Sequence, residues 1–230
     1  MLLFKCFIMC YYIIGDFMNT KKRFFAFLLD MFLVLILATS LSNLDYLNPY
    51  KDKYENAIKK YNDAMSEYGE VLLTTNSKNS LKDTLNFLKD KMIPPMMEVS
   101  KYNLFNSLWY LIIFFLYNVL FAYYNGGQTL GKKVFKIKVV DKGEDKVSFK
   151  NLTLRSLFNG SSLFFGVNII VIIRILISLI PNEFAFMFLI YLVEIISVIY
   201  EVIVLISLFT SKGATLTNDI IAKTEVIEVK

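Results

Sequence analysis

The sequence predicts an all-α polytopic membrane protein with four transmembrane helices, an external helical hairpin and a small cytoplasmic β-hairpin or three-stranded sheet. Hydrophobic residues occupy 56% of the 230 positions, well above a soluble domain. The charged residues, 20% of the chain, gather between four apolar segments that are each long enough to cross a bilayer. The connection at 125–157 is basic, with eight Lys or Arg against three acids, so we place it in the cytoplasm.

Composition excludes several classes of function. The chain has no histidine, and its two cysteines, Cys6 and Cys10, have no further thiol or imidazole to form a metal site. The net charge of +5 equals the excess of the 125–157 connection alone, so it indicates topology rather than nucleic-acid binding. We therefore predict no metal, no cofactor, no nucleic-acid partner and no enzymatic activity.

Residues 1–23 are predicted to be a cytoplasmic N-terminus. Met1 to Ile14 is apolar, but it is short for a span and no small-residue cleavage pattern follows it. An alternative is that Met18 is the biological start, because M-N-T-K-K-R from Met18 is typical of a cytoplasmic N-terminus.

The first predicted span is 24–44, and the basic residues before it place its start inside. Asp30 is its one charge and follows Arg23 by seven residues. Seven residues are nearly two helical turns, so both side chains leave the same face, about 10 Å apart along the axis.

The segment 45–103 is predicted to lie outside as an antiparallel helical hairpin. Its nine basic and nine acidic residues cancel, so nothing opposes translocation. Two apolar repeats of coiled-coil spacing flank a turn at 74–79, and Pro94-Pro95 is expected to end the second helix. The repeats are Tyr54, Ile58, Tyr61, Met65, Tyr68 and Leu72, then Leu81, Leu85, Leu88 and Met92. The hairpin is either a module that senses a partner or ligand, or an insert that packs on itself.

The remaining spans are predicted at 104–124, 158–180 and 184–209, with the tail 210–230 returning to the cytoplasm. The three-residue turn at 181–183 makes the last two spans antiparallel neighbours. Both termini are then cytoplasmic.

A short β-hairpin is predicted within the basic connection. Val134 to Val140 is a β-branched alternating run, 141–145 has turn chemistry, and Val147 to Phe149 resumes the alternation. The alternating run Thr224 to Val229 could add a third strand.

Two groups of charges lie inside the predicted spans, where each charge is costly. Arg174 and Glu194 lie at similar depth on neighbouring spans and are expected to form a structural ion pair. Asp30 and Glu201 also lie at similar depth, and together with Arg23 they are the candidate ion or proton site. The alternative is that Arg23 simply satisfies Asp30 while Glu201 reaches the interface or stays protonated.

These residues resemble the RDD family of bacterial membrane proteins, named for one arginine and two aspartates. Arg23, Ala26 and Asp30 match the family pattern R-x-x-A-x-x-x-D. The most specific match is G-G-Q-T-L-G-K-K-V-F-K-I-K-V-V-D at 126–141, and the resemblance covers about 18–229.

The closing segment L-T-N-D-I-I-A-K-T-E-V-I at 216–227 is similar to the family's last segment. The resemblance makes Asp219 the second aspartate, and we expect it to bond backbone or to pair with Lys132 or Lys133. Asn218 and Lys223 stand where His and Gly are common in the family.

The resemblance implies a protein of the bacterial plasma membrane, with a proposed proton-coupled cation exchange in some relatives. Two hypotheses remain open. The first is a small transporter or cation/proton exchanger that uses the intramembrane carboxylates, expected as a homodimer because four spans enclose little volume. The second is a scaffold or accessory protein in the lipid bilayer that binds partners through the external hairpin and the basic connection.

Overall fold

The computed structural model describes residues 18–74, 80–161, 166–210 and 216–229. The chain divides into two compact units. The first unit consists of the described parts of Met1–Leu33, Phe115–Ser156 and Glu201–Lys230, and the second of Val34–Phe114 and Leu157–Tyr200. Residues 1–17 lie outside the described residues, so the hypothesis that Met18 is the start stays a prediction.

Three helical stretches are long and apolar enough to cross a membrane. They are Lys21–Ser42 within helix α2 (Met18–Ser42), Thr84–Tyr124, and Glu183–Val204 within helix α11 (Glu183–Thr210). These stretches contain most of the first, second and fourth predicted spans. The predicted mostly helical architecture, with helices long and apolar enough to cross a membrane, is thereby confirmed.

The predicted third span, 158–180, differs from expectation. Helix α9 (Phe149–Leu157) ends before it, and strand β2 (Gly160–Ser161) pairs antiparallel with strand β3 (Gly166–Val167). Helix α10 then runs only from Asn168 to Ile177. Ten residues of helix rise about 15 Å, half the hydrocarbon thickness. The β2–β3 pair, with one glycine in each strand, takes the place of the first part of the expected helix, so the described residues give this segment no helix of spanning length.

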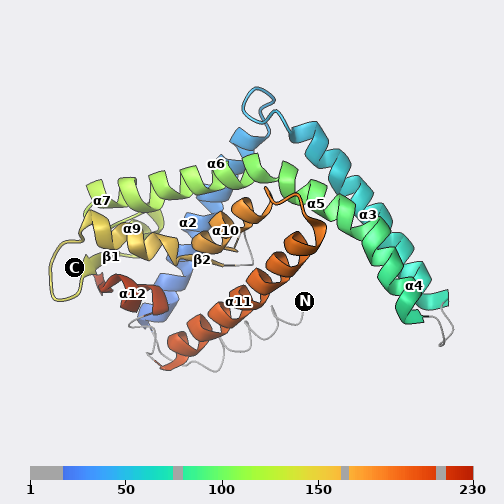
Figure 1. The fold of residues 1–230 in the computed structure, drawn as a ribbon. Coiled ribbons are helices and arrows are strands. Elements are labelled where there is room, and N and C mark those ends of the chain that lie inside the picture. The colour runs from blue at the N-terminus through green and yellow to red at the C-terminus, as the bar shows by residue number, and fades with distance from the viewer. Residues whose placement is uncertain (1–17, 75–79, 162–165, 211–215, 230) are drawn as a thin grey trace. The chain divides into compact units, whose positions relative to one another are not determined.

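The helical hairpin at 45–103 is present in the second unit. Helix α3 (Lys51–Thr74) packs against the stretch formed by α4 (Ser80–Phe87), the π-helix η1 (Leu88–Met92) and α5 (Ile93–Tyr102) (Figure 1). Its seam differs from the predicted repeat.

Alanines, rather than the large apolar residues, lie at the centre of that seam. Ala57 and Ala64 are buried, whereas Met65 and Leu85 are 43% and 56% exposed. The small side chains let the two helices approach closely. Ion pairs join Lys60 to Glu98 and Lys91 to Glu67 across the hairpin.

The expectation that Pro94-Pro95 ends a helix was wrong. The two prolines occupy the first turn of α5, directly after η1. The π-turn of η1 precedes them, and the N–H of Ile93 bonds the carbonyl of Leu88. The helix therefore continues through this point into α6 (Leu104–Phe115).

The first unit adds a small sheet to the ends of its long helices. The helix of α6 continues through the π-helix η2 (Leu116–Phe121) into α7 (Ala122–Tyr124), and helix α8 (Leu130–Val134) follows. Strand β1 (Ile137–Asp141) then pairs antiparallel with β4 (Thr224–Glu228), which follows helix α12 (Thr217–Ala222). The expected pairing with the C-terminal run is confirmed.

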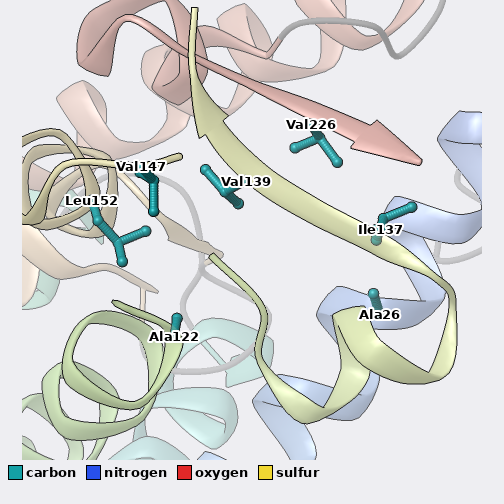
Figure 2. Packing of buried hydrophobic residues seen from close by; sticks show 7 residues of the cluster. All are labelled: Ala26, Ala122, Ile137, Val139, Val147, Leu152 and Val226. Atoms are coloured by element: carbon teal, nitrogen blue, oxygen red, sulfur yellow. The ribbon is translucent and has the colours of Figure 1, made fainter. Parts of the chain in front are cut away.

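The predicted β-hairpin at 134–149 was wrong, because 147–149 does not return as a strand. Ser148 accepts a hydrogen bond from the N–H of Asn151 and begins α9, while its own N–H donates to Asp141. This helix start outcompetes the short alternating run, so the sheet has two strands. Figure 2 shows the core around it, formed by Ala26, Ala122, Ile137, Val139, Val147, Leu152 and Val226.

Candidate functional site

One face of helix α2 holds three buried residues, Arg23, Ala26 and Asp30, which are 8%, 2% and 3% exposed. Their spacing of three and then four residues places them on one side of the helix. Each contacts a segment of the first unit that is distant in sequence. The face therefore fastens the 125–157 connection and the C-terminal tail to the helix.

Asp30 is held by the G-G-Q-T-L-G-K-K segment. Its Oδ1 accepts hydrogen bonds from the Tyr117 hydroxyl at 2.7 Å and the Gly131 N–H at 2.8 Å. Its Oδ2 accepts one from the Thr129 hydroxyl at 2.5 Å. The Lys132 ammonium lies further from Oδ2, at 3.5 Å. The carboxylate is thus satisfied by three short bonds and one long ion pair.

Glycine is required twice in this segment. A Cβ on Gly131 would lie 2.4 Å from the carbonyl oxygen of Ala26, which explains why glycine stands at 131. Gly127 has φ +87°, and a Cβ there would lie 2.0 Å from the carbonyl oxygen of Val139. The glycines therefore permit close backbone packing rather than binding a phosphate.

The polar residues of the segment fix its path. The Gln128 amide donates to the carbonyl of Ile137 at 2.9 Å, and Thr129 caps α8 by accepting from the N–H of Lys132. The Tyr117 hydroxyl, which donates to Asp30, also accepts from the N–H of Leu130 at 3.0 Å. Each contact orients the donors that face Asp30.

Asp219 lies fully buried in α12 between two arginines. Arg155 Nε donates to Oδ1 at 2.7 Å, and Arg23 Nη2 donates to Oδ2, which also accepts from the N–H of Leu216 at 3.0 Å. Burial by itself raises the pKa of Asp219, but the charges of Arg155 and Arg23 outweigh it and lower the pKa from 3.8 to about 2. The carboxylate is therefore ionised at neutral pH.

Lys132 joins the two aspartate clusters electrostatically. Its side chain is 13% exposed and donates to Thr129 Oγ1 at 3.0 Å. Burial lowers its pKa from 10.5 to about 8, with Asp30 opposing this shift and Arg155 adding to it. The network contains three cations and two carboxylates, so it carries one excess positive charge when Lys132 is protonated.

The predicted site is rearranged in part. Arg23 pairs with Asp219 rather than Asp30, and the partners of Asp30 among the described residues do not include Glu201, which lies half-buried in α11. The backbone contact expected for Asp219 is present, since its Oδ2 accepts from the N–H of Leu216, whereas its ion-pair partners among the described residues are Arg23 and Arg155 rather than Lys132 or Lys133. The role of these residues in ion binding stays a prediction.

Sequence reasoning missed Arg155, Tyr117 and Thr129. A signal existed for Thr129 alone, since a threonine three residues before Lys132 at a helix start is a typical N-cap. Arg155 was one of eight basic residues in its connection and had no distinguishing pattern.

The ion pair between Arg174 and Glu194 is confirmed. Arg174 Nη2 lies 2.8 Å from a carboxylate oxygen of Glu194, and the pair joins α10 to α11 within the second unit.

Three helices of the described residues are long and apolar enough to cross a membrane, which indicates an integral membrane protein. The model of the RDD family matches residues 96–223, more than half of the chain, and the chain belongs to that family. No curated protein and no solved structure matches it. The matched range contains Asp219 and the described partners of Asp30, while Arg23 and Asp30 themselves lie before it.

Proposed function

We propose that this protein is a cation/proton exchanger, in which Asp30 binds the cation and Lys132 carries the exchanged proton. The contact that supports this most directly is the long Asp30–Lys132 pair, at 3.5 Å the weakest of the contacts to this carboxylate. A cation that replaces the ammonium leaves the three short hydrogen bonds in place.

The chemistry of the site suits a hard monovalent cation. Asp30 Oδ2 and Thr129 Oγ1 are both within reach of the Lys132 ammonium, so a cation at that position meets oxygen ligands. Loss of one proton from Lys132 and binding of one Na⁺ or K⁺ leaves the charge of the network unchanged. Since the pKa of Lys132 is about 8, this proton can leave near neutral pH.

Lys132→Arg in proteoliposomes tests the proposal. Arginine keeps the positive charge but does not release a proton at working pH. We expect Na⁺ or K⁺ gradients to drive proton movement in wild type, and Lys132→Arg and Asp30→Asn to lose it. Lys133→Arg is the matched control, because Lys133 is exposed and contacts only Asn125 among the polar partners described for it. Wild-type flux in Lys132→Arg would exclude Lys132 as proton carrier, and no flux in wild type would exclude exchange of these ions.

We further propose four membrane-inserted segments in a bacterial plasma membrane, with both termini and the 125–157 connection in the cytoplasm. The basic character of that connection supports this orientation. Labelling of single cysteines placed at exposed Lys142 and Lys53 from either side of the membrane tests it. Labelling of Lys142→Cys from outside intact cells would contradict it.

A scaffold is the second candidate, and it is favoured by the saturation of both aspartates. Asp30 and Asp219 are fully engaged by protein donors, which suits a fastening role. Under this hypothesis the basic connection and the hairpin at 45–103 bind protein partners. Two results together would support the scaffold over the exchanger. Deletion of the hairpin would remove a protein that co-purifies with the wild-type chain, and cells that carry Lys132→Arg would show the wild-type phenotype.

A further inference from the structure

The Arg174–Glu194 pair lies near the middle of a membrane-spanning stretch. Glu194 is the twelfth of the 22 residues in Glu183–Val204, and Arg174 reaches it from α10 with Nη2 2.8 Å from the carboxylate. Charges at this depth are costly unless protein or water surrounds them. The Arg174–Glu194 pair therefore needs protein or water around it.

The pair lies at the edge of a broad exposed apolar face. The side chains of Arg174 and Glu194 are 28% and 49% exposed. One side of α11 is buried against the second unit's own core, which contains Phe186, Ile190 and Val193. The other side is exposed and apolar, and the residues that flank Glu194 there are Tyr191 at 59%, Ile195 at 59% and Val198 at 61%.

Lipid tails satisfy the apolar part of this face but not the two partly exposed charges. The patch holds one cation and one anion side by side, which makes it self-complementary under a two-fold axis. When two copies of the chain meet around this axis, the arginine of each copy can approach the glutamate of the other. A guanidinium has five donors, so it can donate to two carboxylates. The same contact removes the charges from lipid and covers the apolar residues around them.

We propose that this face of α10 and α11 is the interface between two copies of the chain, with the Arg174 and Glu194 side chains of both copies forming one four-charge cluster. The interface residues belong to the second unit, whereas the exchange site belongs to the first. The inference therefore does not depend on the proposed function.

Cross-linking of the full-length chain in lipid nanodiscs tests the location of the interface. Val198→Cys, with Cys6 and Cys10 replaced by serine, is expected to form a disulfide-linked dimer, because residue 198 lies about 40° from Glu194 around the helix. Ile196→Cys is the matched control: it is 50% exposed and lies only about 3 Å from residue 198 along the axis, but it is about 160° from Glu194, on the opposite side of the helix. Equal cross-linking at both positions, or at neither, would overturn the proposed interface.

Charge reversal tests the cluster itself. A copy with Arg174→Glu carries two acids, and a copy with Glu194→Arg carries two arginines, so each repels itself and attracts the other. With different tags on the two copies, we expect the mixed pair to co-purify about tenfold more than either copy with itself. Equal recovery of mixed and like pairs would refute the cluster. If either reversed copy fails to fold, the milder variant Arg174→Gln is tested instead. We expect this variant to dissociate into monomers, which the particle mass measures. A particle mass equal to that of the wild-type dimer would refute the cluster.

Discussion

Replacing Asp219 by asparagine is expected to destabilise the first unit strongly, because it strands two buried arginines. The substitution keeps the shape and one acceptor oxygen but removes the negative charge between Arg23 and Arg155, whose side chains are 7% and 9% exposed. A pKa lowered from 3.8 to about 2 corresponds to roughly 2–3 kcal/mol of charge-specific stabilisation. Removing one partner of a buried ion pair costs about 3–5 kcal/mol, so we expect a loss of about 3 kcal/mol or more.

Thermal unfolding in detergent, followed by fluorescence-detected size exclusion, measures this loss. About 3 kcal/mol corresponds to a fall in Tm of roughly 6–12 °C for a chain of this size. Asp141→Asn is the matched control, since Asp141 is also a buried carboxylate of this unit but accepts one backbone bond and has no ion pair described. A further Arg23→Gln change in the Asp219→Asn chain should recover part of the loss by removing one stranded cation. Equal Tm values for Asp219→Asn and Asp141→Asn would refute the reasoning.

Three further predictions concern stability in the same assay. Because the folded-state pKa of Asp219 lies below its unfolded value, its contribution is complete above about pH 4 and is lost as pH falls towards 2; this acid-dependent part should be missing from Asp219→Asn. Gly131→Ala should cost about 1–3 kcal/mol through its clash with the α2 backbone. Gly69→Ala, at an exposed position of α3 with open space around it, should stabilise by about 1 kcal/mol. The opposite order of the two Tm values would contradict the packing argument. Lys223→Gly should raise stability by about 1 kcal/mol, since Lys223 has φ 54° at the end of α12, and a lower Tm would show that its side chain outweighs this strain.

Helix periodicity predicted part of the candidate site. It correctly placed Arg23 and Asp30 on one face of a helix, because spacing along a single helix is a local property. It did not predict their partners, which lie 196 positions away for Arg23 and about 100 for Asp30. The expected contact between them failed because each met a closer partner from another segment, and no local pattern ranks such choices.

The fold shows the same division between local and distant determinants. The long apolar helices and the pairing of β1 with β4 followed from hydropathy and alternation. The prediction of a third span was wrong because hydropathy treats Phe158 to Ile180 as one apolar segment and does not register the glycines in it. The helix α10 begins only at Asn168, after those glycines. The short strand expected at 147–149 does not form, because α9 begins there. The Ser148 hydroxyl accepts a hydrogen bond from the N–H of Asn151 at the start of that helix.

The two candidate functions make different use of the Asp30 carboxylate, and they depend on different contacts to it. A fastener needs all contacts of Asp30 to persist, while an exchanger needs one to be replaceable. The bonds from Tyr117 and Gly131 are 2.7 and 2.8 Å, and the Lys132 contact is 3.5 Å. Under the proposed function, exchange at the long contact leaves the segment fastened by the short ones, so Asp30 both holds the segment and binds the cation. Lys132→Arg therefore distinguishes the two roles without unfastening the segment.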